Sequence, residues 1–227
     1  MDQNYLKRTG SYDDLRQIRK KYGKKGYGFV KSRMLQELGS RYDRWIAENE
    51  KAGEKDPLSG SLPLISVFLS GETGEKTDLQ ASVGSVENQT YPNWELISDP
   101  GQKAEGEFIA FLDAGDVMAP DALYEMVKVL QKDPEHDLLY SDEDQISEDG
   151  KERFSPFFKP DWSPDLLMDL PYAAHLALYR RSLAEAAGEI RAGLSEAEVY
   201  DLLLRFTENC DSHRIGHVPK VLYHRRR

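Results

Sequence analysis

Residues 107–123 (EFIAFLDAGDVMAPDAL) constrain the fold of this 227-residue chain more than any other stretch. A short apolar run at 108–112 ends abruptly in Asp113, and Asp116 and Pro120 follow. Such a run is typical of a strand buried on both faces of a sheet. Open α/β sheets bind ligands at the carboxyl ends of their strands, and paired carboxylates there suit Mg²⁺ or Mn²⁺ bound to a diphosphate. A strand that simply ends in an Asp-rich turn is the alternative interpretation.

Apolar runs and amphipathic segments alternate along the chain after residue 62. Strands are predicted at 64–69, 94–97, 108–112 and 137–140, and helices at 78–88 and 120–132. Strand–helix alternation of this kind predicts an α/β fold with a mainly parallel sheet and helices on its faces.

The connection between the second and third predicted strands is unusually short. Only the eight residues 99–106 separate them, whereas a parallel crossover normally needs a dozen or more and usually contains a helix. Eight extended residues reach roughly 27 Å, enough to return along a short strand but not to supply a covering helix. We therefore expect this part of the sheet to be thinly covered, or the two strands to depart from a normal βαβ arrangement.

The first 61 residues have a different character. They are strongly charged, with a basic cluster at 19–25, and the apolar spacing within 29–49 predicts an amphipathic helix. A polar linker with Gly and Pro follows at 50–61. We therefore expect a helical extension and linker at 1–61 and an α/β domain at 62–227. The basic cluster either contacts anionic lipid or forms a solvated face, which the pattern favours.

Charge and cysteine content narrow the functional classes. The net charge of −10 and the pI of about 5.1 argue against nucleic acid as a partner. Cys210 is the single cysteine, so no internal disulfide can form, which fits a reducing compartment. No apolar run approaches the roughly 18 residues that span a bilayer, and residues 1–14 contain no signal-peptide apolar region. The expected location is cytoplasmic, with peripheral membrane contact left open.

Eight stretches between residues 62 and 226 carry a resemblance to a known family. They are PLISVFLS (63–70), SVENQTYPNWEL (85–96), GEFIAFLDAGDVMAPDALYEMV (106–127), LLYSDEDQI (138–146), FSPFFKPDWSPDLL (154–167), HLALYRRSL (175–183), YDLLLR (200–205) and HVPKVLYHRR (217–226). In these stretches the chain resembles family 2 glycosyltransferases with the GT-A fold, of the kind found in bacterial surface-polysaccharide gene clusters. The resemblance implies a GT-A-like sheet, truncated because the family's helix–strand–helix block before the metal motif is missing here.

The resemblance also implies an activity and a set of site residues. Such enzymes transfer a sugar, with inversion, from a nucleotide-diphospho-sugar to an acceptor, and they use a divalent metal. For this chain it implies a UDP- or dTDP-sugar donor, a glycan or lipid-linked acceptor, and Mg²⁺ or Mn²⁺. The candidate nucleotide contacts are Glu72, Asp99 and Asp113. The candidate metal ligands are Asp113, Asp116 and His224, and a surface histidine in a basic tail is the alternative for His224.

Among the departures from the family pattern, two concern the metal and the catalytic base. Gly115 replaces an acidic residue of the metal motif, and Val199 stands where the catalytic aspartate is expected. Valine accepts no proton, and inverting transfer needs a base within hydrogen-bond reach of the acceptor hydroxyl. Glu198 is the candidate replacement base, and Glu196, nearly one helical turn away, is the other. Two functions remain open: a glycosyltransferase with weak or no activity, and a non-catalytic GT-A-like domain that binds a partner or glycan.

Three further features have open roles. The acidic cluster 141–144 is expected to be a polar loop, with an acceptor or metal contact as the alternative. The aromatic segment 154–162 either stacks on sugars and bases or covers a sheet edge. His175, between Ala174 and Leu176, is expected to be a packed core histidine rather than a ligand.

Overall fold

The computed structural model describes residues 20, 36–39, 41–50, 55–70, 76–99, 101–188 and 194–227. The chain divides into two compact units, Met1–Lys55 and Asp56–Arg227. In the first unit, residues 36–39 and 41–49 are helical, as the apolar spacing predicts, and Tyr42 stacks on Trp45 with ring centroids 5.7 Å apart. Residues 29–35 of the predicted helix and most of the basic cluster lie outside the described residues.

The second unit is built on one sheet, which has eight strands in the described residues. The strands are β1 (Ile65–Ser70), β2 (Trp94–Ile97), β3 (Phe108–Asp113), β4 (Val117–Met118), β5 (Leu138–Ile146), β6 (Arg153–Phe157), β7 (Ala177–Arg180) and β8 (Ile215–Arg226). Their order is β2-β1-β3-β7-β5-β8-β4, and β6 pairs with β5 outside this path. The four strands predicted from the sequence are therefore confirmed as β1, β2, β3 and β5, although β5 is longer than expected.

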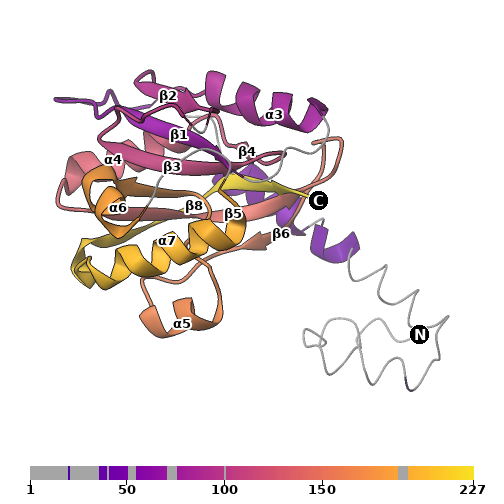
Figure 1. The fold of residues 1–227 in the computed structure, drawn as a ribbon. Helices are drawn as coiled ribbons and strands as arrows, with labels where there is room; N and C mark the ends of the chain where they lie inside the picture. Colours follow the sequence, from indigo (N-terminus) through magenta and orange to yellow (C-terminus); the bar gives the residue numbers. More distant parts are fainter. Residues whose placement is uncertain are drawn as a thin grey trace. The chain divides into compact units, whose positions relative to one another are not determined.

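Helices cover both faces of this sheet (Figure 1). They are α3 (Lys76–Glu87), α4 (Ala122–Lys132), α5 (Pro164–Asp169), α6 (Arg181–Ala187) and α7 (Glu196–Glu208). Val67 of β1 packs in a hydrophobic cluster with α3 and α4, whereas its neighbour Phe68 packs in a second cluster with α6 and α7. Successive strand residues point to opposite faces, and helices cover both faces of β1. The residues on both faces must therefore be apolar, which explains the continuous apolar runs of the sequence.

The parallel core of the sheet is confirmed, and the rest of the sheet is mixed. β1 pairs in parallel with both β2 and β3, and β5 pairs in parallel with β8. The other pairings are antiparallel: β7 lies between β3 and β5 and runs against both, β6 runs against β5, and β4 runs against β8. The sheet is thus a mixed α/β sheet with a parallel region that ends at Asp113.

The short connection after β2 crosses β1 directly. β2 and β3 both pair with β1 rather than with each other, so the link must pass over β1 to reach the start of β3. The Gly106 amide donates to Ser66 Oγ at 2.9 Å, and Ser66 Oγ donates to Glu95 Oε1 at 2.5 Å. A Cβ atom on Gly106 would lie 2.8 Å from the Leu64 carbonyl oxygen, so only glycine permits this approach. As expected, the described residues of the link contain no helix, and β2 and β3 depart from a normal βαβ pair.

The last residues of the predicted linker belong to the second unit. Tyr124 of α4 donates to the Asp56 carbonyl at 2.7 Å, and the Ser59 amide donates to Gln131 Oε1 at 3.2 Å.

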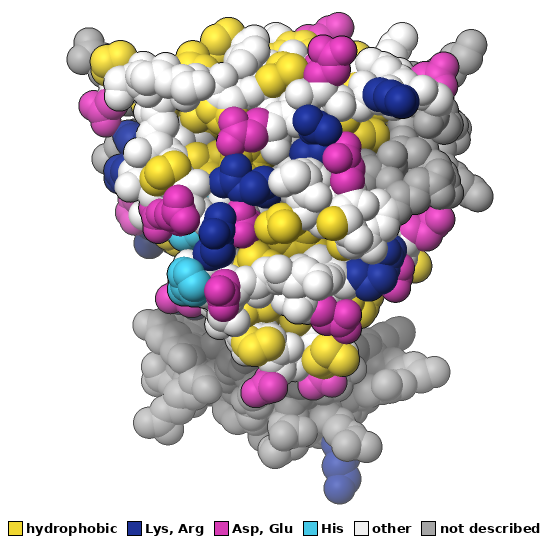
Figure 2. Space-filling model, turned by 60° about the vertical axis from the view of Figure 1, so that its left-hand side comes forward, with side chains coloured by type: hydrophobic (Ala, Val, Ile, Leu, Met, Phe, Trp, Pro, Cys, Tyr) yellow, Lys and Arg dark blue, Asp and Glu magenta, His cyan; other side chains and the backbone are white. Residues whose placement is uncertain are grey.

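None of the helices in the described part of the chain has the length and apolar character needed to cross a bilayer. On the face shown in Figure 2, Lys and Arg side chains lie among Asp and Glu side chains.

Candidate functional site

The turn after β3 places Asp113 and Asp116 next to each other. The Asp116 amide donates to the Asp113 carbonyl at 3.0 Å, and Gly115 between them has a φ of 102°. That left-handed conformation favours glycine, which gives a local reason for Gly115 at the position where the resemblance predicts an acid. Ser82 of α3 fixes the turn, because its hydroxyl accepts from the Gly115 amide at 2.9 Å.

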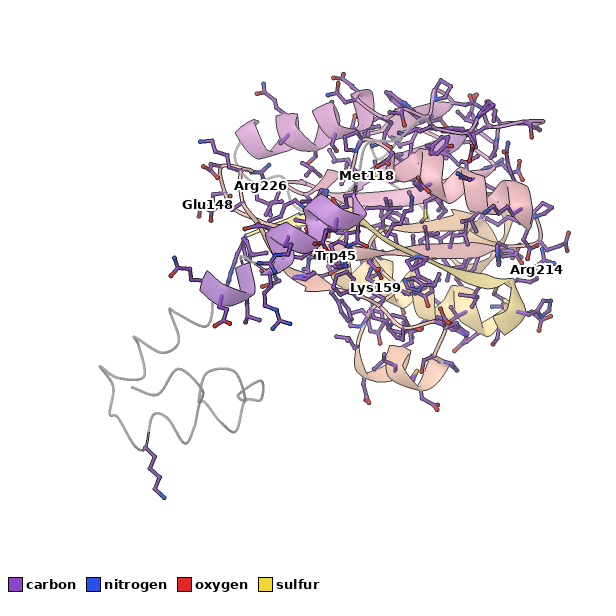
Figure 3. All side chains as sticks on the ribbon, turned by 180° about the vertical axis from the view of Figure 1, so that it is seen from behind. Trp45, Met118, Glu148, Lys159, Arg214 and Arg226 are labelled. Carbon is purple, nitrogen blue, oxygen red and sulfur yellow. The ribbon has the colours of Figure 1, made fainter. Side chains whose placement is uncertain are left out.

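Asp116 is buried and holds the end of β8. Its Oδ1 accepts from the Arg226 amide at 2.7 Å, and it also hydrogen-bonds the Tyr223 hydroxyl. Burial raises the pKa of Asp116 to about 6, and the neighbouring charge of Asp113 acts in the same direction. The Arg226 side chain completes the contact by donating to the carbonyls of Gly115 and Glu148, beside which it lies in Figure 3.

His175 is buried, as predicted, but it also joins two carboxylates. Its Nε2 lies 3.2 Å from Asp113 Oδ2 and its Nδ1 lies 3.5 Å from Glu143 Oε2. The imidazole stacks on Tyr223 with ring centroids 5.2 Å apart. Burial disfavours the imidazolium, yet the two carboxylates outweigh this effect and raise the pKa of His175 to about 9. A cation therefore stands between β3 and β5 at neutral pH.

The acidic cluster 141–144 is not the polar loop that the sequence suggested. All four residues are buried within β5. Glu143 Oε2 lies 3.0 Å from Lys159 Nζ, and burial of this carboxyl is outweighed by His175 and Lys159, which lower the pKa of Glu143 to about 2. Sequence analysis missed this arrangement because the compensating cations come from segments distant in the chain.

Lys159 anchors the aromatic segment 154–162 to the site (Figure 3). Its side chain is fully buried; its Nζ donates to the His175 carbonyl, and its backbone amide donates to Asp142 Oδ1 at 2.8 Å. Burial lowers the pKa of Lys159, against the opposing charge of Glu143. The segment also contributes β6, which pairs with β5, so it supports the site from one side of the sheet.

The predicted metal ligands are only partly brought together. His224 Nδ1 lies 2.6 Å from Asp144 Oδ1, and strand alternation places this pair on the face of β8 opposite to Tyr223. Within the described residues, no three His, Cys, Asp or Glu side chains converge on one point that could hold a metal ion. The Asp113 side chain keeps 22% exposure. These residues therefore fit a divalent ion only if phosphate oxygens and water complete its coordination shell.

The candidate nucleotide contacts lie at one edge of the sheet where the structure describes them. Asp99 is exposed just beyond β2, and its Oδ1 accepts from the Gly101 amide at 2.8 Å. β2 and β3 both run parallel to β1, so Asp99 and Asp113 lie at the same edge. Glu72 lies outside the described residues.

The start of α7 faces the same region. Val199 is buried, and Glu198 forms a capping box in which its carboxylate accepts from the Ser195 amide at 2.8 Å. Glu196 instead lies 3.4 Å from Arg225 Nη2, and Arg225 Nη1 lies 3.8 Å from Glu143 Oε1. Of the two candidate bases, Glu196 is thus the one connected to the site, while Glu198 stabilises the helix end.

Two curated bacterial proteins are similar to the chain in sequence. The chain is 32% identical over 230 residues to the O-antigen biosynthesis protein RfbC of Myxococcus xanthus, an alignment that covers 82% of the chain and 18% of that protein. It is 33% identical over 201 residues to the uncharacterized protein y4gI of Sinorhizobium fredii, covering 71% of the chain and 22% of that protein. The chain thus spans about a fifth of the length of these curated relatives. No protein-family model matches it.

Solved structures decide the fold. S. aureus TarS, in complexes with UDP and with UDP-GlcNAc, superimposes with a TM-score of 0.51 in both cases, at 16% and 15% identity. The match covers 72% of the chain and 60% and 58% of the TarS chains. The chain has the GT-A glycosyltransferase fold. Its GT-A sheet is shortened beside β2, where the expected block between β2 and β3 is replaced by the link across β1.

A cavity of about 300 Å³ lies elsewhere in the GT-A unit. Its lining includes Phe108, the first residue of β3, together with Ser59, Gln131 and Arg180. Asp113 ends the same strand, so this cavity and the acidic turn lie at opposite ends of β3. This cavity is therefore not part of the candidate site, which consists of the side chains at the carboxyl edge of the sheet.

Proposed function

We propose that this chain is the donor-binding part of a glycosyltransferase of bacterial polysaccharide synthesis. In this proposal it binds a UDP- or dTDP-sugar and presents it to a glycan or lipid-linked acceptor. The names of the similar proteins support this: RfbC is an O-antigen biosynthesis protein, and TarS was solved with UDP and UDP-GlcNAc. Because the chain spans only a fifth of its curated relatives, the whole activity is assigned here as a proposal.

The position of Asp113 is the observation that carries the proposal. Its partly exposed carboxylate ends the parallel region β2-β1-β3, and open α/β sheets bind ligands beyond the carboxyl ends of such strands. Asp99 follows β2 and is exposed at the same edge of the sheet. Glu72 remains a predicted nucleotide contact.

Mg²⁺ or Mn²⁺ is the metal that we assign to this site. Asp113 would hold the ion, with Asp116 behind it, and the bound metal would stabilise the departing diphosphate. The oxygen chemistry of both carboxylates suits these ions. His224 is a less suitable ligand than predicted, because its Nδ1 is paired with Asp144.

A non-catalytic GT-A domain is the alternative function. Val199 is buried at the position of the expected base, and the Glu198 carboxylate is held in the capping box of α7. A chain of this kind would retain donor or glycan binding without rapid transfer. The two functions share the donor site and differ in turnover.

Calorimetric titration of UDP, UDP-sugars and dTDP-sugars, with and without Mn²⁺, tests the proposal. We expect saturable binding that strengthens with Mn²⁺ and weakens in Asp113→Asn. Asp211→Asn is a suitable control, because it removes an exposed carboxyl that is not part of the candidate site. Asp211 lies beside the 3-10 helix at Ser212–Arg214, far from Asp113 in the sequence. Absence of binding by the parent chain to every nucleotide, with and without metal, would refute the proposal.

A further inference from the structure

The cavity beside Phe108 lies at the amino ends of the parallel strands, away from the acidic turn. Pro63, just before β1, and Phe108, the first residue of β3, belong to its lining. Because a strand rises about 3.3 Å per residue, Phe108 and Asp113 at the two ends of β3 are roughly 17 Å apart. The cavity volume of about 300 Å³ is at the lower end of the range for small-molecule pockets, roughly 300–1,000 Å³. A ligand bound here would therefore be separate from the donor.

Hydrogen bonds hold one wall of this cavity in place. The Ser59 amide donates to Gln131 Oε1 at 3.2 Å, and Gln131 Nε2 donates back to the Ser59 carbonyl. Further along the same wall, the Tyr91 hydroxyl donates to the Pro63 carbonyl at 2.6 Å. The segment 59–63 is thus attached to the domain at both of its ends, so the cavity is already formed without a ligand.

Three polar groups of the lining have hydrogen-bonding capacity to spare. Ser59 and Ser61 are exposed, and within the described residues neither hydroxyl has a hydrogen-bond partner. Glu107 Oε1 accepts from Arg180 Nη1 at 2.9 Å, whereas Glu107 Oε2 has no such partner in the part of the chain that the structure describes. A ligand rich in hydroxyl groups can accept from the two serines and donate to the carboxylate.

The charges of the lining offset each other. Glu107 and Arg180 are its two charged residues and they form an ion pair. Arg180 also donates from Nε to Asp137 Oδ1 at 2.6 Å and from Nη2 to the Pro134 and His136 carbonyls, each at 2.9 Å. Most of its five donors are therefore committed to the protein. A phosphate or carboxylate would find no unpaired cation here, so the lining favours a neutral ligand.

The deeper part of the lining is apolar. The side chains of Phe108 and Leu130 are buried, and Pro63 and Pro134 lie beside them. An apolar base with a few polar groups around it is the usual composition of a small-molecule site. A sugar ring matches it, since the ring has apolar C–H faces and hydroxyl groups at its edge.

We propose that this cavity binds a neutral sugar unit of a glycan, independently of the nucleotide-sugar donor. The choice of a glycan rests on the proposed function, in which the chain serves polysaccharide synthesis. The hydroxyls of Ser59 and Ser61 and the free oxygen of Glu107 hydrogen-bond the sugar hydroxyls, while a C–H face of the ring packs on Leu130. A glycan held here stays on the domain without occupying the donor edge of the sheet.

Saturation-transfer NMR tests the inference with three neutral probes: methyl α-D-glucopyranoside, a mannose disaccharide and a disaccharide of N-acetylglucosamine. Glucuronic acid is the anionic comparison, and UDP with Mn²⁺ is titrated separately by calorimetry. The variants are Ser59→Ala/Ser61→Ala, Glu107→Ala and Asp113→Asn. Glu105→Ala is the matched control, because Glu105 is an exposed carboxylate two residues from Glu107 and is not part of the lining.

We expect the parent to bind at least one neutral probe saturably. A single neutral hydrogen bond changes affinity by roughly fivefold, so Glu107→Ala and the double serine variant should each weaken saccharide binding by at least that factor. Neither should change UDP affinity, and Glu105→Ala should behave like the parent. Asp113→Asn should show the reverse pattern, with weaker UDP binding and parent-like saccharide binding.

Four outcomes would overturn the inference. They are no saturation transfer from any neutral probe, parent-like saccharide binding by both cavity variants, loss of saccharide binding in Asp113→Asn, and a preference for glucuronic acid over the neutral probes. The UDP titration decides the proposed function separately. Cavity-dependent saccharide binding without any UDP binding would refute the donor site and support the glycan site.

Discussion

His175 lies between Asp113 and Glu143, with its two ring nitrogens 3.2 Å and 3.5 Å from their carboxylate oxygens. This single side chain connects the end of β3, where the donor site is proposed, to the buried acidic part of β5. Because the two carboxylates raise the pKa of His175 to about 9, the imidazolium that makes this connection persists at neutral pH. The stability of the fold should consequently respond to pH at this position.

The first prediction concerns that response. The folded-state pKa of His175 is about 9, above the ordinary value of 6.5, so its stabilising contribution is fully present below pH 6.5 and is lost as the pH rises through 9. The stability difference between the parent and His175→Gln should shrink by about 3 kcal/mol from pH 6 to pH 9.5. Urea unfolding at several pH values measures it. His213→Gln, at a side chain 75% exposed, should show no comparable trend.

The second prediction concerns the buried ammonium of Lys159. Lys159→Met leaves Glu143 without the cation that lies 3.0 Å from its carboxylate, so we expect a loss of about 3–5 kcal/mol in unfolding free energy. The double variant Lys159→Met/Glu143→Gln should recover part of this loss, because no buried charge is then left without its partner. Urea denaturation of both variants decides the matter, and equal losses would contradict the charge argument.

The core of the fold could be predicted because its signals are local. The run at 108–112 contains only apolar residues, and β3 spans this run and ends at Asp113. The eight-residue link is likewise too short to contain a covering helix, and in the structure its Gly106 packs directly against β1. The antiparallel insertion of β7 between β3 and β5 could not be predicted, because it depends on pairings between strands far apart in sequence.

The residues of the candidate site that follow the end of a strand could be predicted from the sequence. The acidic residues whose charge is neutralised by cations distant in the chain could not. Asp113 and Asp116 stand at the expected edge of the sheet. The acidic cluster 141–144 looked like a loop because most of the groups that pair with it lie far from it in sequence. Arg153, which pairs with Asp144, is only nine residues away, but Lys159, His175, His217 and His224 are brought to β5 by the fold.

The third prediction concerns Asp116 and metal. Asp116→Asn retains an oxygen that can accept from the Arg226 amide, so the fold should persist, while the carboxylate charge behind Asp113 is lost. We expect the Mn²⁺-dependent part of UDP binding to disappear, and metal binding without nucleotide to be weak in the parent. Calorimetry with Mn²⁺, UDP and both together measures these quantities. Parent-like affinity of the variant for Mn²⁺–UDP would show that Asp116 does not serve the metal.

The fourth prediction separates the capping role of Glu198 from a catalytic one. The Glu198 carboxylate accepts from both the Ser195 amide and the Ser195 hydroxyl, at 2.8 and 2.7 Å. Glu198→Ala should therefore lower the unfolding free energy by about 1 kcal/mol, within the range for lost helix caps, and leave UDP affinity unchanged. Ser195→Ala should cost a similar amount, and the double variant should cost less than the sum. Thermal and urea unfolding supply the numbers.

The last prediction concerns turnover. Val199 is 3% exposed and stands where the resemblance predicts the catalytic base, which typically contributes roughly 10²–10⁴-fold to the rate. We expect UDP release from UDP-sugars to be very slow or absent in the parent, even with candidate acceptors. Val199→Asp should raise the rate of UDP release if the donor binds. The control Val199→Asn, which has the same side-chain shape as Val199→Asp, should not raise it, because an amide accepts no proton at neutral pH.

The outcome that would contradict this prediction is equally specific. Robust UDP release by the parent chain, abolished by Glu198→Gln, would identify Glu198 as a relocated base despite its capping box. The same loss on Glu196→Gln would assign the role to the carboxylate that pairs with Arg225 at 3.4 Å. Both variants keep the shape of the side chain and remove only the carboxylate that can accept a proton. A lower rate in one variant alone therefore identifies which glutamate is the base, and any robust rate in the parent excludes an inactive domain.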